Sequence, residues 1–322
     1  MDDAPRLPLK YRLLAAGIAG AVMAALTYKA YGLSDLPSSD FDQIWTGVHP
    51  FVRGQDPYQA VAASGLHAPL FYPLTALIAV APLGFLSAGV ARIVFAGLGY
   101  AALAYAGTGR RGALFIALLS ASAINAALGG QWSPLLTAGA AVPWLSVFWI
   151  AKPNLGLSLA AAYPHRQALW GAILITALSF LFLPNWFSEW YATLGDRAHL
   201  PLIVRPGGVI LLLAALRWRR PEGRLLLALA CIPGSAALYE TVPLFLIPAT
   251  RYEGYALAIF SYVAAALMGL LVPAAKAPDM MIGWWPYLLW LLYVPALVMV
   301  LVRPNEWPTR RPAQRPRGKV VQ

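Results

Sequence analysis

Three aspartates stand close together in a chain that has few acidic residues. Asp40, Asp42 and Asp56 lie within one polar segment, whereas the 322 residues include only 13 acidic ones. A carboxylate beside a membrane is costly to leave unpaired, so its presence there indicates a function. An ionised carboxylate is also the group that a general base requires. The segment is therefore the first candidate for a catalytic site.

The residues around the first two aspartates predict a short amphipathic helix. Ser39 and Asp42 have the spacing of a capping box. Apolar residues follow at near-helical intervals until Pro50, which must end or kink the helix. Asp40 and Asp42, two positions apart, point to different sides of a helix. We therefore expect Asp40 to be the candidate base and Asp42 a possible second acid; the alternative is that both only cap the helix.

The composition predicts an all-α polytopic membrane protein. The chain is 60% hydrophobic and 11% charged, against roughly 25% charged residues in a soluble domain. Cys231 is the only cysteine, which excludes an intrachain disulfide. Apolar segments near the length of a membrane span recur along the chain and predict a bundle of about 12 spans, within a range of about 10 to 12. They cover approximately residues 12–32, 69–86, 88–107, 112–128, 133–150, 154–163, 167–184, 207–217, 223–233, 236–250, 255–273 and 284–302.

The basic residues predict the orientation of this bundle. They gather before the first apolar segment, around residues 217–224 and in a Pro- and Arg-rich tail at 303–322, which gives a net charge of +11. Bases at span ends mark the cytoplasmic side, and the tail has the composition of a disordered segment that contacts anionic lipid. This placement argues against nucleic acid as a partner. Residues 1–302 then form one transmembrane domain with two outside loops, 33–68 and 184–206, and both termini in the cytoplasm.

Several short motifs follow one another between residues 38 and 250. They are Asp40-Phe41 with Trp45, Gly54-x-Asp56-Pro57-Tyr58, Phe71-Tyr72-Pro73-Leu74 ahead of Ala81-Pro82-Leu83, Gly130-Gln131, Lys152-Pro153, and the segment from Pro233 to Pro248. In order and spacing they resemble the polyprenol-phosphate-mannose-dependent α-mannosyltransferases of glycosyltransferase family 87, in the GT-C superfamily. That family often has a histidine in the last motif, where this chain has Tyr239 and Glu240.

The resemblance implies a fold, a reaction and a location. The fold would be a GT-C-like helical bundle whose active site lies at the outer membrane face, with Asp40 as the base by its position. The donor would be a polyprenyl-phosphate hexose, with mannose expected, and the acceptor a hydroxyl of a glycolipid or glycan. The setting would be the cytoplasmic (inner) membrane of a bacterium.

Few further groups are needed for this chemistry. One carboxylate that removes the acceptor proton suffices for an inverting displacement, whereas glycoside hydrolases need two. The departing phosphate needs cations, and Lys152 and Arg205 have suitable positions; Arg205 also precedes a short helix whose amides can hold phosphate. The candidates for the substrate pocket are Tyr58, His67, Tyr72, Gln131, Tyr239 and Glu240.

Glu240 has a second interpretation, as an acid near a helix end that pairs with a nearby cation. The four histidines show no metal-ligand spacing, so no cofactor or metal is indicated. Two other classes remain open for the whole protein. One is a noncatalytic or degenerate membrane subunit, and the other is a lipid or solute transporter. A transporter would carry polar residues at mid-span depth and related halves, whereas this sequence has few such residues and no evident repeat.

Overall fold

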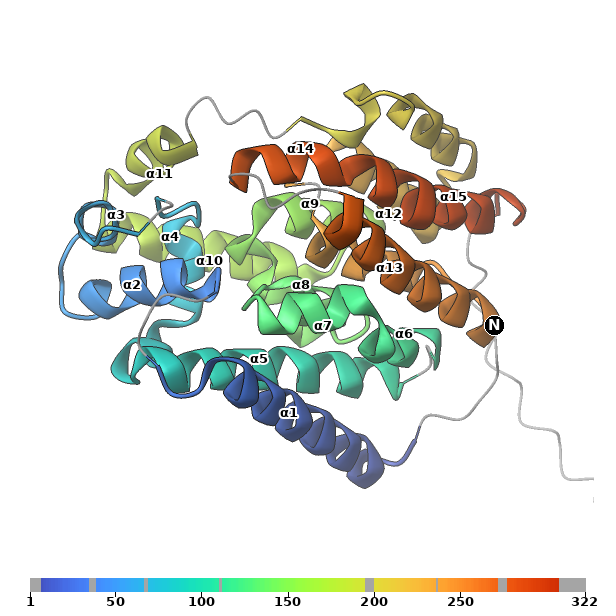
Figure 1. The fold of residues 1–322 in the computed structure, drawn as a ribbon. Coiled ribbons are helices and arrows are strands. Elements are labelled where there is room, and N and C mark those ends of the chain that lie inside the picture. Colours follow the sequence, from blue (N-terminus) through green and yellow to red (C-terminus); the bar gives the residue numbers. More distant parts are fainter. Residues whose placement is uncertain are drawn as a thin grey trace, which may run out of the picture.

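The computed structural model describes residues 7–34, 39–66, 69–109, 112–194, 200–235, 237–271 and 277–306. Within these ranges every regular element is a helix (Figure 1), so the predicted all-α class is confirmed. The α-helices are α1 (Leu9–Tyr31), α2 (Phe41–Phe51), α3 (Pro57–Ala63), α4 (Leu74–Ala79), α5 (Ala88–Gly107), α6 (Gly112–Ile116), α7 (Ala121–Leu128), α8 (Ser133–Gly139), α9 (Pro153–Ala162), α10 (Arg166–Phe182), α11 (Trp186–Leu194), α12 (Pro221–Cys231), α13 (Arg251–Leu271), α14 (Ala277–Leu288) and α15 (Val294–Leu301). The tighter 3₁₀ segments are η1 (Ala81–Phe85), η2 (Ala117–Leu119), η3 (Pro143–Ala151), η4 (Leu202–Val204), η5 (Gly208–Arg217) and η6 (Leu238–Leu246), and η7 (Leu289–Tyr293) is π-helical.

Three helical stretches among the described residues are long and apolar enough to cross a membrane. They are α1, α5 and the continuous stretch Gly283–Leu301, and the number rises to 4 if α10 and α11, which meet at 101°, form one broken span. Other predicted segments are divided into shorter helices; proline, which is favoured in the first turn of a helix, begins both η3 and α9. The membrane class therefore stands, while about 12 crossings remain a prediction.

The described helices of the two predicted outside loops lie at the opposite end of the bundle from the start of α1 and the end of α15 (Figure 1). In Figure 1, α2, α3 and α11 lie together at the left, and α1 begins and α15 ends at the right. At the left end, Trp190 Nε1 donates a hydrogen bond to the carbonyl of Phe71 at 2.9 Å, which joins α11 to the segment after α3. At the other end, Arg217 Nη2 donates to the Leu301 carbonyl at 2.7 Å. The long helices connect these two ends. The assignment of the α2–α3 end to the outer side of the membrane stays a prediction.

Small residues bring α1 directly against α5. A Cβ on Gly20 would lie 3.0 Å from the Gly97 carbonyl oxygen, and a Cβ on Gly97 would lie 3.2 Å from that of Gly20. Helix pairs in membranes use glycine in this way to approach closely. The contact fixes α1 relative to α5.

Arg303, the first residue of the predicted basic tail, is bonded to the helical bundle. Its Nη1 donates to the Ile247 carbonyl at 2.7 Å, and its Nη2 lies 2.6 Å from Glu253 Oε2. These bonds hold Arg303 against the bundle. Residues 307–322 of the predicted tail lie outside the described residues.

Candidate functional site

Asp40 stands immediately before α2 and is partly buried. The helix is held in place by its apolar side, because Phe41, Ile44 and Val48 are almost fully buried. The backbone N–H of Ser39 donates to Asp42 Oδ2 at 2.5 Å, which is one half of the predicted capping box. Asp42 therefore closes the helix start, and the Asp40 carboxylate is left for other partners.

Gln131 binds the Asp40 carboxylate. Its Nε2 donates to Asp40 Oδ2 at 2.5 Å. The preceding residue, Gly130, has a φ of +65°, a conformation that glycine adopts at little cost. A Cβ on Gly130 would lie only 2.3 Å from the Cβ of Phe41. The glycine therefore lets the turn before α8 lie against the start of α2, and this places Gln131 beside Asp40.

The other end of the Gln131 amide binds an ammonium group and a phenol. Its Oε1 accepts hydrogen bonds from Lys152 Nζ at 3.0 Å and from the Tyr72 hydroxyl at 3.3 Å. Gln131 and Tyr72 are both buried. Because a side-chain amide offers donors at one end and an acceptor at the other, Gln131 bridges a carboxylate and an ammonium group.

Lys152 forms an ion pair with Glu240. Lys152 Nζ lies 3.1 Å from Glu240 Oε1 and 4.8 Å from the centre of the Tyr239 ring, a distance that permits a cation–π contact. The Glu240 carboxylate also accepts from Asn154 Nδ2 at 3.1 Å and from the Ser235 backbone N–H at 2.9 Å. Pairing with a cation was the second interpretation of Glu240, and the structure identifies that cation as Lys152.

These side chains form one connected group, here called the Asp40–Glu240 network. It comprises Asp40, Gln131, Tyr72, Lys152, Tyr239 and Glu240, all of which are sequence-predicted site residues.

Tyr58 contacts the network through the backbone of Tyr72. Its hydroxyl donates to the carbonyl of Tyr72 at 3.2 Å. Asp56 caps α3, since its Oδ1 accepts from the backbone N–H of Tyr58 at 2.9 Å and of Gln59 at 3.2 Å. The Asp-Pro-Tyr motif therefore positions Tyr58, and Tyr58 in turn holds the segment that carries Tyr72.

Asp42, the possible second acid, forms an ion pair of its own with Arg92. Its Oδ1 lies 2.5 Å from Arg92 Nη2, in an ion pair whose side chains are 0% exposed for Arg92 and 6% for Asp42. A buried charge of this kind requires its partner, so Asp42 connects α2 to α5. Sequence reasoning missed Arg92. The signal was present, because Arg92 is the one charged residue in the apolar segment 88–107.

One other predicted residue among those described, Arg205, is not joined to the network. Among the described residues, Arg205 shares no hydrogen bond or ion pair with Asp40, Lys152 or Glu240; it follows η4, and its Nε is buried without a partner. His67 lies outside the residues that the structure describes. Asn154 and Ser235 were not predicted as site residues. Asn154 directly follows the Lys152-Pro153 motif and Ser235 lies in the segment from Pro233 to Pro248, so their places in the sequence could have indicated them.

The surroundings of the network alter its acid–base properties. Burial raises the pKa of Asp40 above its ordinary value, against the opposing effects of Lys152 and the Gln131 hydrogen bond.

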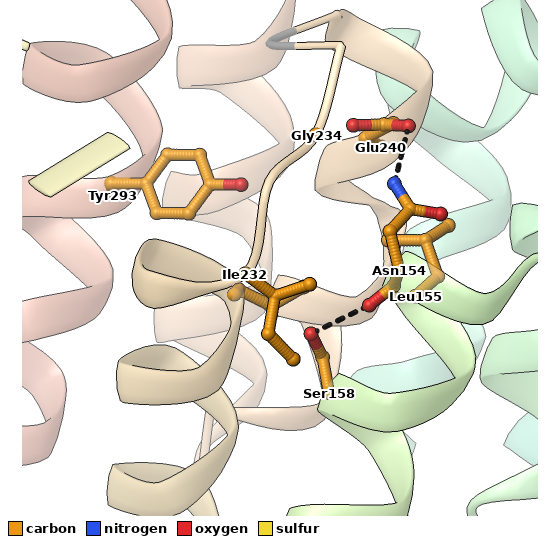
Figure 2. A pocket seen from close by; sticks show the side chains of 8 residues that line it. Asn154, Leu155, Ser158, Ile232, Gly234, Glu240 and Tyr293 are labelled. Atoms are coloured by element: carbon orange, nitrogen blue, oxygen red, sulfur yellow. Dashed lines mark hydrogen bonds between the residues drawn. The ribbon is translucent and has the colours of Figure 1, made fainter. Parts of the chain in front are cut away.

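A cavity of about 20 Å³ borders Glu240, with Asn154, Ser158 and Tyr293 around it (Figure 2). This volume is room for about one water molecule. Within the described part of the chain, no three His, Cys, Asp or Glu residues are grouped as metal ligands.

In comparisons with known proteins, no family model, no curated protein and no solved structure matches the chain. The family resemblance therefore depends on the sequence motifs alone. The functional argument depends on those motifs and on the geometry of the network.

Proposed function

We propose that this protein is a membrane glycosyltransferase of GT-C-like architecture. It moves a hexose from polyprenyl phosphate to a hydroxyl of a glycolipid or glycan at the outer membrane face. Mannose is the hexose that we expect. The proposal is supported by a carboxylate and an ammonium group on opposite ends of one buried amide. The reaction requires one group of each kind, a base for the acceptor and a cation for the leaving phosphate.

Asp40 acts on the acceptor. The acceptor oxygen forms a bond to C1 of the sugar, and its proton passes to the Asp40 carboxylate. The C1–O bond to phosphate breaks, its electron pair leaves with polyprenyl phosphate, and C1 is inverted. Partial exposure leaves Asp40 accessible to the acceptor. The raised pKa of Asp40 makes its carboxylate a stronger proton acceptor than an ordinary aspartate.

Lys152 acts on the leaving group. Negative charge builds up on the phosphate as the C1–O bond breaks, and a preorganised cation lowers the energy of that state. Lys152 is held by Gln131 at 3.0 Å and by Glu240 at 3.1 Å. Because Gln131 binds both Asp40 and Lys152, it fixes the spacing between the base and the cation. This bridge is the single observation that carries the proposal.

Sugar transfer provides the test. Membranes containing the wild-type protein are incubated with radiolabelled polyprenyl-phosphate mannose, and label in acceptor products is measured. Asp40→Asn should reduce transfer by about 100-fold or more, the usual contribution of a general base. Glu253→Gln is the matched control, because Glu253 pairs with Arg303 outside the network; it should keep most of the activity.

The remaining outcomes are also informative. Normal transfer by Asp40→Asn would keep the reaction class and reject Asp40 as the base. No transfer by the wild-type protein, in membranes where both donor and acceptors are present, would contradict the proposed donor.

A further inference from the structure

The charges of the Asp40–Glu240 network do not balance. It contains two carboxylates, Asp40 and Glu240, and one ammonium group, Lys152. With all three ionised, the formal charge is −1. In the described part of the chain, no other charged side chain is bonded to any of these three groups. The resting site therefore carries an excess negative charge in largely buried surroundings.

The proposed donor would add to this excess. This step rests on the proposed function. A polyprenyl-phosphate sugar is a phosphodiester and carries one negative charge at any physiological pH. Its phosphate must approach Lys152, which Glu240 already contacts at 3.1 Å. The bound state would then hold three negative groups and one positive group. Uncompensated charge of this kind is expensive away from water, and a buried carboxylate that loses its partner usually takes a proton instead.

We propose that Glu240 takes up one proton from bulk water when the donor phosphate binds Lys152. The phosphate replaces the carboxylate as the principal partner of the ammonium group, and Glu240 becomes a neutral acid. Two donors stay in place, since Asn154 Nδ2 and the Ser235 N–H bond to the carboxyl oxygens without involving Lys152. The cavity beside Glu240 has room for about one water molecule, which can deliver the proton.

The groups around Glu240 leave it as the carboxylate that can be neutralised. Lys152 contacts it from the junction of η3 and α9, and Tyr239 adjoins it on η6. Tyr293 on η7 lines the cavity beside it (Figure 2). Both phenols are neutral over the physiological range. The remaining cavity residues of α9 and α12 do not titrate. Asp40, reached through Gln131, must stay ionised to serve as the base, so Glu240 is the carboxylate that can accept the proton without loss of function.

Calorimetry on the full-length protein in lipid nanodiscs measures this proton directly. The probe is a short-chain prenyl-phosphoryl mannose, titrated in buffers of different ionisation enthalpy. We expect the wild-type protein to take up about one proton per probe bound, and its affinity to fall about tenfold per pH unit at higher pH. Glu240→Gln should bind the probe with no proton uptake and little pH dependence. Glu253→Gln is the matched control, because Glu253 pairs with Arg303, and should behave as the wild type.

The possible failures are distinguishable. Probe binding by the wild type without proton uptake would overturn this inference and leave the proposed function intact, and this result does not depend on any variant folding. Proton uptake that persists in Glu240→Gln and disappears in Asp40→Asn would assign the proton to Asp40, which also overturns it. Absence of probe binding by the wild type at every pH would overturn the proposed function together with the inference.

Discussion

Gly130 and Phe41 are packed so closely that only glycine fits at position 130. A Cβ there would lie 2.3 Å from the Cβ of Phe41, and the φ of Gly130 is +65°. The residues next to this contact are Gln131 and Asp40, which share a hydrogen bond. A backbone contact between the turn before α8 and the start of α2 thus sets the position of the candidate base.

Gly130→Ala should separate Asp40 from Gln131. The methyl group clashes with Phe41, and the left-handed conformation adds about 1–2 kcal/mol of strain. We expect a lower melting temperature in detergent and loss of sugar transfer. Gly65→Ala is the control, because Gly65 also has a positive φ, +76°, but a Cβ there meets nothing within 4 Å. That variant should show the conformational cost alone and keep its activity; equal losses in both variants would contradict the packing argument.

Breaking the Arg92–Asp42 pair should destabilise the protein. Arg92→Met leaves a buried aspartate without its cation, and such losses cost about 3–5 kcal/mol. The double variant Arg92→Met with Asp42→Asn removes both charges and should recover much of that stability. Denaturant unfolding in micelles measures both effects. If Asp42 were instead a second catalytic acid, the double variant would be stable and inactive, which we do not expect.

Sugar transfer should depend on pH through Asp40. Protonated Asp40 cannot accept the acceptor proton, so the rate at saturating donor should fall as the pH falls through the pKa of Asp40. Burial raises that pKa, so the midpoint should lie above the ordinary value of about 3.9. Gln131→Met removes a hydrogen bond that lowers the pKa and should move the midpoint further up. A downward shift in Gln131→Met would contradict the assignment.

Lys152 should prove both structural and catalytic, and two variants separate these roles. Lys152→Met leaves Glu240 buried without its cation and should lose stability as well as transfer. Adding Glu240→Gln removes the unpaired charge and should restore the melting temperature. Transfer should stay absent in the double variant, because no cation remains for the phosphate. Recovery of transfer along with stability would show that Lys152 acts only in folding.

Much of the site was predictable because its residue types are rare in this chain. Lys152 and Glu240 are isolated charges in apolar surroundings, where a charge needs a partner or a function, and Asp40 belongs to a polar segment that holds three of the 13 acidic residues. Their pairing was not predictable, since each contact joins distant segments. Arg92 was overlooked, although a lone arginine in a span implies a buried acid. Arg205 was predicted to bind phosphate because of its place in an outside loop. A place in a loop does not indicate how far Arg205 lies from Lys152.

The fold was predictable in class and less so in detail. Apolar length identified α1, α5 and the stretch Gly283–Leu301 within a few residues. It did not indicate that segment 133–150 divides into α8 and η3. Hydropathy counts apolar residues and is insensitive to breaks such as the one at Pro143, where a new helix begins. The number of crossings depends on those breaks.

The order in which the chain is synthesised has a consequence for the network. The bond between Asp40 and Gln131 joins residues 91 positions apart, and that between Asn154 and Glu240 joins residues 86 apart. Because chains emerge from the N-terminus, Lys152 enters the membrane long before its counter-ion exists. A nascent chain that stops before η6 would contain Asp40 and Lys152 without Glu240, the acid that pairs with Lys152. Lys152 therefore meets its counter-ion late in biogenesis, once nearly the whole bundle has been synthesised.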